Sequence, residues 1–364
     1  MTSGRAEDPK SPRVPEWLVE QLRKRFTPYP PPEPRRFNPA EKSTEELLEI
    51  GLPPRPDATR QRLARELWDE AFDKEVTIVP FVFDEAMLQS IGYQLLNRQV
   101  DAMPIEETRF ETSSNWSGVY ITGNRDRQFM QLWGVWTVPE QLDLPPGNYQ
   151  GPVGLPYVCS NWIGLDGQRL YLDSSLPQIG TANTLNLPGP PIVVAWIQWW
   201  ARGNTTTVPL PIGLTVHPGD EVLAVLTAID PQTVNFVMAN LTTGDAMPAK
   251  ATAPPVTLPN GTTVYPSIAG ATAEWIVERP KVLHSEDRCN FPNYHTSDFS
   301  YCFAIEAEAV NITSLLDGIV QKLRGERMIR MFDVLGNPQR TAFISMPRKT
   351  SDTSIHLDWG GFFS

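Results

Sequence analysis

From about residue 108 to the end, the sequence consists of short apolar or alternating runs, each closed by Pro, Gly, Asn or Asp. Runs of this length and period are typical of strands, and many in succession favour an antiparallel sandwich or barrel, hence an all-β fold. The 36 prolines gather before residue 56 and between residues 145 and 266, where they punctuate turns rather than interrupt helices. The strands predicted on this basis are 116–122, 131–138, 158–165, 193–200, 221–228, 235–241, 273–278, 328–334, 341–346 and 354–359.

Residues 1–107 follow a different pattern, which is helical and rich in proline. Ser43 and Glu46 form a capping box, and the spacing of apolar residues predicts further helices near 17–26 and 57–72, followed by a β-rich run over 76–83. We predict an appended helical leader at 1–107, a candidate propeptide, and a β domain at 108–364. Within that domain an amphipathic helix is predicted near 313–325, because Leu315, Ile319 and Leu323 share one helical face.

Charge and composition restrict the partners. The net charge is −11, and no cluster of Lys and Arg extends beyond a few residues, which argues against a nucleic-acid partner. No apolar run reaches transmembrane length, and the first 24 residues contain no continuous apolar stretch, so neither a membrane span nor a secretory signal is predicted. The three cysteines lack metal-ligand spacing, so no metal, no cofactor and no disulfide framework are predicted. The localisation and the oligomeric state stay open.

The usual enzyme motifs are missing, since the sequence contains no phosphate-binding Gly-rich loop, no zinc-binding HExxH and no GxSxG elbow. Three predicted strands instead combine aromatic and polar side chains on one face, because residues two apart in a strand project from the same side. These residues are Trp162, Gly164 and Asp166; Trp196, Gln198 and Trp200; and Glu274, Ile276 and Glu278. Since a carboxylate on an inner face needs a partner, the three faces are predicted to line a wet, concave surface that suits peptides or sugars.

Eight segments in order resemble those of the glutamic peptidases, or eqolisins, and the helical leader resembles that of bacterial members. The segments are 113–118, 134–139, 162–167, 176–181, 195–200, 218–220, 240–244 and 273–278. The resemblance implies a concanavalin A-like sandwich of two antiparallel sheets behind an N-terminal helical extension. It also implies an acid-acting endopeptidase with protein or peptide substrates.

The same resemblance implies the site residues. Glu278 is expected to act as general base and acid, and Gln178 to stabilise the oxyanion. The supporting residues are expected to be Trp116, Trp162, Asp166, Trp196, Gln198, Trp200 and Glu274. Gln198 stands where secreted relatives usually have a glutamate, so a charge is lost beside the proposed pair, which is expected to change the pH dependence or weaken the activity.

Three other interpretations fit the same residues. A non-catalytic, lectin-like sandwich that binds carbohydrates or peptides would use Trp116, Trp162, Trp196 and Trp200 as stacking surfaces and would not need Glu278. A glycosidase would need two carboxylates, for which Asp166 and Glu278 are the one evident pair. A catalytically silent interaction domain would retain the scaffold alone.

Overall fold

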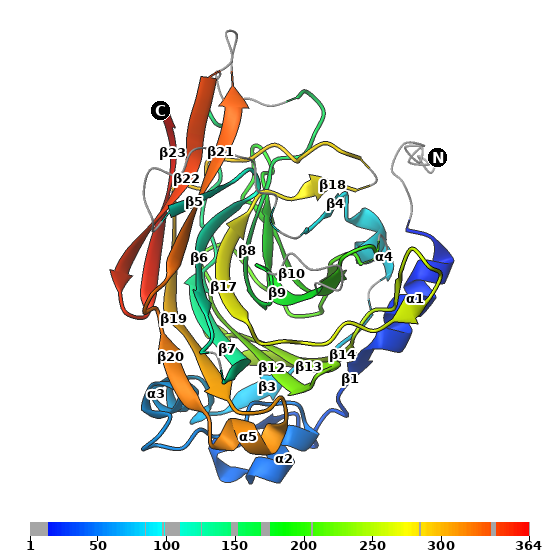
Figure 1. Ribbon diagram of the computed structural model, residues 1–364, viewed down its shortest axis with the longest axis vertical. Helices are drawn as coiled ribbons and strands as arrows, with labels where there is room; N and C mark the ends of the chain where they lie inside the picture. The colour runs from blue at the N-terminus through cyan, green and yellow to red at the C-terminus, as the bar shows by residue number, and fades with distance from the viewer. Residues whose placement is uncertain are drawn as a thin grey trace, which may run out of the picture.

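The computed structural model describes residues 14–83, 85–96, 98, 110–124, 126–146, 152–168, 175–204, 207–283, 285–335 and 340–363 of the chain. Strands dominate these residues, and nineteen of them are joined by hydrogen bonds into one sheet (Figure 1). The predicted boundary at residues 107 and 108 lies outside the described residues. Among the helices of the described part, none is long and apolar enough to cross a membrane.

The leader contains helices in the three predicted places and a short strand within the predicted β-rich run, and it also contains a fourth α-helix and three short strands that were not predicted. Its elements are α1 (Glu16–Arg25), β1 (Phe26–Pro28), β2 (Arg36–Phe37), a 3-10 turn (Pro39–Glu41), α2 (Thr44–Glu49), α3 (Arg62–Phe72), β3 (Val76–Ile78), α4 (Glu85–Ser90) and β4 (Tyr93–Gln94). The capping box of Ser43 and Glu46 is present at the start of α2. Helix α3 begins at Arg62, later than predicted, because the Asp57 carboxylate accepts the amides of Thr59 and Arg60 and holds a turn there.

The β part has two arms of hydrogen-bonded strands. The first contains β6 (Trp116–Thr122), β17 (Thr272–Glu278), β8 (Val158–Leu165), β9 (Ser175–Thr184), β10 (Ile192–Ala201) and β11 (Leu210–Pro211), in that spatial order. The second contains β20 (Ile319–Lys322), β19 (Thr296–Ala307), β7 (Gln128–Thr137), β12 (Glu221–Asp230), β13 (Thr233–Asn240) and β14 (Asp245–Thr252).

Three long strands connect the two arms. β21 (Arg327–Leu335) pairs with β6 and with β5 (Phe110–Ser113), β22 (Arg340–Ser351) follows it, and β23 (Ser354–Phe363) pairs with β19. Two small hairpins lie outside the large sheet: β15 (Val256–Thr257) with β16 (Thr263–Val264), and β4 with β18 (Lys281–Val282). In Figure 1 the first arm curves, and β4, β18 and α4 lie inside its arc.

The core lies between the two arms, where odd-numbered side chains of β17 and β8 meet strand β7. The indole nitrogen of Trp275 donates to the carbonyl oxygen of Trp133 at 2.8 Å. A Cβ on Gly134 would lie 2.9 Å from Ile163, so a glycine is needed for the two arms to approach this closely. Because odd-numbered side chains fill this core, the even-numbered side chains of the same strands project from the opposite face.

The leader is attached to the β part along several elements. β1 pairs antiparallel with β14, and β3 pairs parallel with the start of β14. The buried Gln61 side chain donates to the carbonyl oxygens of Leu315 and Gly318 at 2.8 and 3.1 Å. Asn235 of β13 donates to the carbonyl oxygen of Gly51 at 2.7 Å. The leader therefore extends and covers the second arm.

The helix predicted near 313–325 is largely wrong. Helix α5 spans only Ile312–Leu316, and Ile319–Lys322 forms β20, which pairs with Phe303–Glu306 of β19. An edge of β19 is available at this point, and pairing with that edge satisfies backbone N–H and C=O groups of both segments. The β-branched Ile319 and Val320 also suit a strand.

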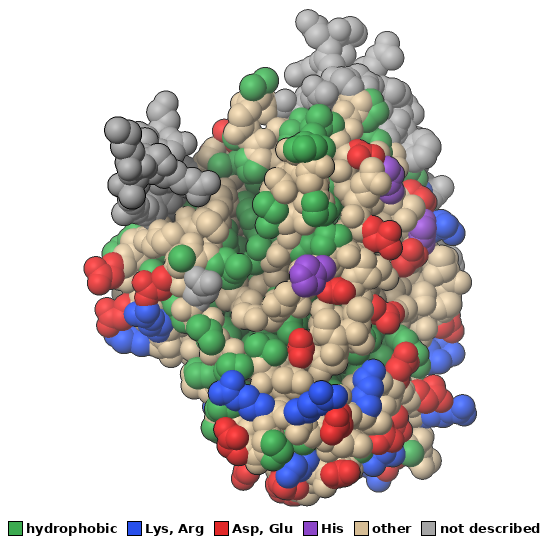
Figure 2. Space-filling view, turned by 180° about the vertical axis from the view of Figure 1, so that it is seen from behind, with side chains coloured by type: hydrophobic (Ala, Val, Ile, Leu, Met, Phe, Trp, Pro, Cys, Tyr) green, Lys and Arg blue, Asp and Glu red, His purple; other side chains and the backbone are tan. Residues whose placement is uncertain are grey.

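Charged side chains of both signs are mixed on the surface. Figure 2 shows Lys and Arg lying among Asp and Glu on the visible face, above all at the end that carries α2, α3 and α5. Several of these residues form ion pairs, for example Arg62 with Glu66 and Lys42 with Glu46.

Candidate active site

The predicted residues of the first arm come together on one face because the strands are in register. Glu278 lies opposite Ser160, Ile276 opposite Trp162, and Glu274 opposite Gly164. In the next strand, β9, Gly180 lies opposite Trp162 and Gln178 lies opposite Gly164. Gln198 of β10 lies opposite Gln178. The even-numbered faces predicted from alternation are thereby confirmed for β17, β8 and β10.

Glycines make room for the central indole of this face. A Cβ on Gly180 would lie 2.5 Å from the Cβ of Trp162, and a Cβ on Gly164 would lie 3.0 Å from the Trp162 ring. The Trp162 ring therefore occupies space that larger residues would fill. It packs edge-on against Trp116, with ring centroids 4.8 Å apart.

Glu278 is fully buried, and both of its carboxyl oxygens accept hydrogen bonds. Its Oε2 accepts from the indole nitrogen of Trp162 at 2.9 Å, and its Oε1 accepts from the backbone amide of Leu96 at 3.1 Å. Burial raises the pKa of the Glu278 carboxyl well above its usual range, and the hydrogen bonds from Leu96 and Trp162 partly oppose that rise. A carboxyl group with a raised pKa and a defined hydrogen-bond geometry is suited to proton transfer.

Gln178 and Gln198 form a buried pair of amides. The Nε2 of Gln178 donates to the Oε1 of Gln198 at 3.0 Å. The Nε2 of Gln198 donates to two carbonyl oxygens, that of Thr207 at 2.6 Å and that of Leu95 at 3.2 Å. Because both acceptors are carbonyl oxygens, the orientation of the Gln198 amide is fixed.

A segment of the leader lies across both groups. We call residues 91–96 the strap. Its strand β4 pairs antiparallel with β18, and the carbonyl oxygen of Gly92 accepts from the amide of Leu283 at 3.0 Å. Beyond the strap, Arg98 is buried and donates to Gln168 at 2.8 Å and to the carbonyl oxygen of Thr112 at 2.9 Å.

One peptide group of the strap joins the two parts of the site. The C=O of Leu95 points to Gln198, and the N–H of the same peptide group, from Leu96, points to Glu278. The carbonyl oxygen and the amide hydrogen of a trans peptide lie on opposite sides of its C–N bond. Glu278 and the amide pair therefore lie on opposite sides of one peptide bond.

The prediction that these faces line a wet surface is wrong for the structure as it stands. Glu274, Glu278, Gln178 and Gln198 are each 0% exposed, and so are Trp116, Trp162 and Trp196. The strap replaces the expected water next to Glu278 and Gln198 with its own backbone groups and with the buried Leu95 side chain. The rings on which a lectin-like site would depend are also inaccessible here.

Asp166 and Glu274 lie beside this site, and the Asp166 carboxylate binds backbone amides of the loop before β17. Asp166 follows β8 with a positive φ of 67°, and its carboxylate accepts the amides of Ala269 and Ala271 at 2.6 and 2.7 Å. It therefore organises the loop before β17. Burial, followed by the nearby charge of Asp166, raises the pKa of the Glu274 carboxyl well above its usual range.

The remaining predicted residues border the site. The Trp196 indole donates to the Ser160 hydroxyl at 3.1 Å, and Trp200 is partly buried further along the same strand. Sequence reasoning missed Leu95, Leu96 and Thr207, which contact Glu278 and Gln198 through backbone atoms. Every residue type supplies a backbone C=O, and every type except proline supplies an N–H, so no side-chain pattern in the sequence marks these residues.

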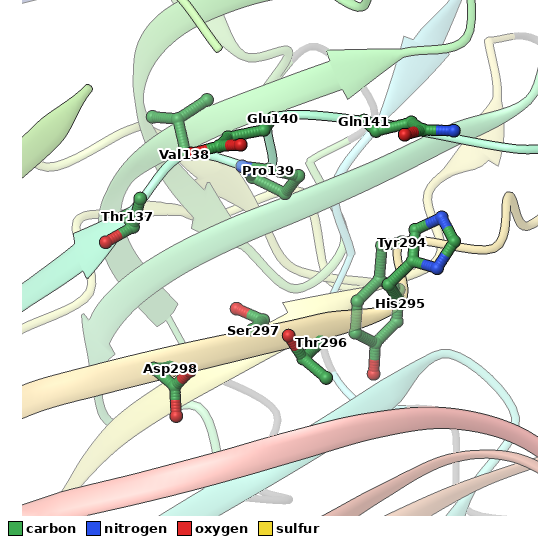
Figure 3. A pocket seen from close by; sticks show the side chains of 10 residues that line it. All are labelled: Thr137, Val138, Pro139, Glu140, Gln141, Tyr294, His295, Thr296, Ser297 and Asp298. Carbon is green, nitrogen blue, oxygen red and sulfur yellow. The ribbon is translucent and has the colours of Figure 1, made fainter. Parts of the chain in front are cut away.

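A separate hollow of about 380 Å³ lies at the end of β7 and the start of β19 (Figure 3). Tyr294 and His295 line it on one side, and Glu140 lies on the other. None of the predicted site residues contributes to its wall. This hollow is therefore distinct from the site around Glu278.

Comparisons with known proteins agree with the resemblance stated above. The model of the peptidase A4 family matches residues 114–324, which is more than half of the chain. A crystal structure of scytalido-glutamic peptidase with a transition state analog inhibitor is 20% identical, with a TM-score of 0.48, covering 68% of this chain and 98% of that one. SCP-B, a member of the eqolisin family in complex with the tripeptide Ala-Ile-His, is 18% identical, with a TM-score of 0.45 and coverages of 68% and 98%.

Aspergilloglutamic peptidase from Aspergillus niger is 17% identical, with a TM-score of 0.40, covering 56% of this chain and 99% of that one. A comparison with curated proteins gave no match. The family match defines the class of protein as a hydrolase of peptide bonds. The chain belongs to the peptidase A4 family, the glutamic peptidases or eqolisins, as its sequence segments predicted.

Proposed function

We propose that the chain is an acid-acting endopeptidase in which Glu278 is the general base and acid and Gln178 stabilises the oxyanion. The observation that carries this proposal is the peptide group between Leu95 and Leu96. Its N–H contacts Glu278 and its C=O contacts Gln198, to which Gln178 donates. The peptide group thus lies between Glu278 and the amide pair, as a substrate peptide bond would.

The proposed reaction begins with a water that enters once the strap has left. Glu278 as carboxylate removes a proton from this water while the water oxygen bonds to the scissile carbonyl carbon. The carbonyl oxygen becomes negative and is stabilised by amide N–H groups. When the carbon–nitrogen bond breaks, Glu278 returns the proton to the leaving amine, which leaves a carboxylic acid and an amine.

The pH range follows from the environment of Glu278. An ordinary Glu titrates near pH ~4.3, and burial under the strap raises the pKa of Glu278. Displacement of the strap rehydrates the carboxyl group and brings its pKa back toward the ordinary value. The open site then holds the carboxylate in mildly acidic solution. We therefore propose that the strap acts on the activity by covering the site.

The division of the chain and the finer description of the fold belong to the same proposal. We propose that 108–364 is the peptidase domain, that its two arms are the layers of a concanavalin A-like sandwich, and that 1–107 is a leader. The pairing of β1 and β3 with β14 supports a leader that stays with the domain. Protein or peptide chains are the proposed substrates.

The test is hydrolysis of denatured casein from acidic to neutral pH by the purified full chain and by a Leu95→Asp chain, whose strap cannot bury a charge. Glu278→Gln and Gln178→Ala, each in the Leu95→Asp background, are expected to lose the activity. Glu306→Gln is the matched control, because Glu306 is equally buried but lies in the other arm, where it accepts from Asn124 and Gln321. Cleavage that persists in both catalytic variants would reject the assignment.

A further inference from the structure

The amide group of Gln198 has no role in the proposed reaction, although all of its hydrogen-bonding atoms have partners. Its Oε1 accepts from Gln178, one Nε2 hydrogen is donated to Thr207, and the other is donated to the Leu95 carbonyl oxygen. Thr207 and Gln178 remain in place when the strap leaves. One N–H of Gln198 is then free and points to the position that a carbonyl oxygen occupied.

We propose that Gln198 is a second amide donor to the carbonyl oxygen of the scissile peptide bond, and that the Leu95–Leu96 peptide group of the strap occupies the place of that bond. This inference rests on the proposed function. Gln178 acts on Gln198 as well, because its N–H holds the Gln198 Oε1 and so turns the Nε2 toward the carbonyl oxygen.

The chemistry of the site requires an amide at this position. A carboxylate in the place of Gln198 would face the carbonyl oxygens of Thr207 and Leu95 with no hydrogen to donate. Gln198 supplies a hydrogen to each of them at 0% exposure, where an unpaired polar group is costly. A glutamine at position 198, where secreted relatives usually have a glutamate, therefore removes a negative charge and adds N–H donors.

The expected magnitude follows from other sites of this kind. Removing one preorganised donor to an oxyanion lowers kcat by about 10²- to 10³-fold. Gln198→Leu removes the donor and keeps a similar volume, so in the Leu95→Asp background we expect kcat to fall by about 100-fold and KM to change less. Gln131→Leu is the matched control, because Gln131 is also buried between one donor and one acceptor but lies on β7 of the other arm.

Gln198→Glu tests the donor directly. A protonated Glu carries one O–H and can donate to the carbonyl oxygen, whereas the carboxylate cannot. The ratio of parent to Gln198→Glu kcat is therefore expected to grow as the pH rises from acidic to neutral. A role limited to packing would lower kcat by the same factor at every pH.

A second measurement is independent of turnover. Because Gln198 also holds the strap carbonyl, Gln198→Leu in the otherwise unchanged full chain is expected to speed amide hydrogen exchange in residues 91–96, and Gln131→Leu is not. Unchanged exchange in Gln198→Leu would overturn the contact, and a kcat within about threefold of the parent would overturn the donor role. If no variant hydrolyses casein but exchange rises, Gln198 binds a peptide carbonyl and the proposed peptidase function fails instead.

Discussion

Shortening Leu95 tests whether the strap controls access to the site. Leu95 is 0% exposed, and a Leu→Ala change at such a position costs about 2–5 kcal/mol. Leu95 packs in the site only while the strap covers it, so the substitution destabilises the closed state relative to the open state. At about 1.4 kcal/mol per tenfold, even 2 kcal/mol raises the open fraction about 30-fold.

The assay is the initial rate on a quenched fluorescent peptide at acidic pH, with calorimetry to confirm folding. Leu95→Ala is expected to raise the rate by at least about 30-fold while the strap still covers most molecules. Leu67→Ala is the control, because Leu67 is equally buried but lies in α3, away from the strap. A folded Leu95→Ala chain with the parent rate would refute the idea that the strap limits access.

Three further outcomes are expected. Glu278→Gln is expected to flatten the pH dependence of the free energy of unfolding, because burial raises the folded-state pKa of Glu278. The stabilisation by Glu278 is fully present below about pH 4.3 and is lost, by up to ~1.4 kcal/mol per pH unit, as the pH rises toward the folded-state pKa. Denaturant titrations at several pH values would measure this loss. Trp162→Phe in the Leu95→Asp background removes the hydrogen bond to Glu278 and raises its pKa further, so the acidic limb of the pH–rate profile moves to higher pH. Asp166→Asn removes the charge that accepts backbone amides of the loop before β17, and urea unfolding is expected to show a loss of about 2–3 kcal/mol.

The strand pattern of the β part could be predicted because the residues that end each strand are its neighbours in the sequence. The strands at 116–122 and 158–165 match β6 and β8, since polar residues, Gly and Pro bound each run. Strand β9 was not predicted, although its segment was recognised, because Pro177 and Gly180 interrupt its alternation. The prediction of a helix near 313–325 was wrong because the apolar residues Ile319 and Val320 fit a strand as well as a helix.

The candidate site could be predicted only in part. Alternation placed Glu278, Trp162 and Gln198 on shared faces, since period two is a property of each strand. Their burial could not be predicted, because it comes from a backbone contact between residues 182 positions apart in the chain. Pairing between such distant segments depends on the tertiary arrangement, and no local pattern records it.

The attachment of β1 and β3 to β14 has a consequence for competition at the site. A strap tethered to a docked leader remains near the site after it is displaced, at an effective concentration on the order of millimolar. An incoming peptide must therefore outcompete a neighbour that never diffuses away. Weakly binding peptides would be excluded on that basis, and a long unfolded chain with many binding registers would have the advantage.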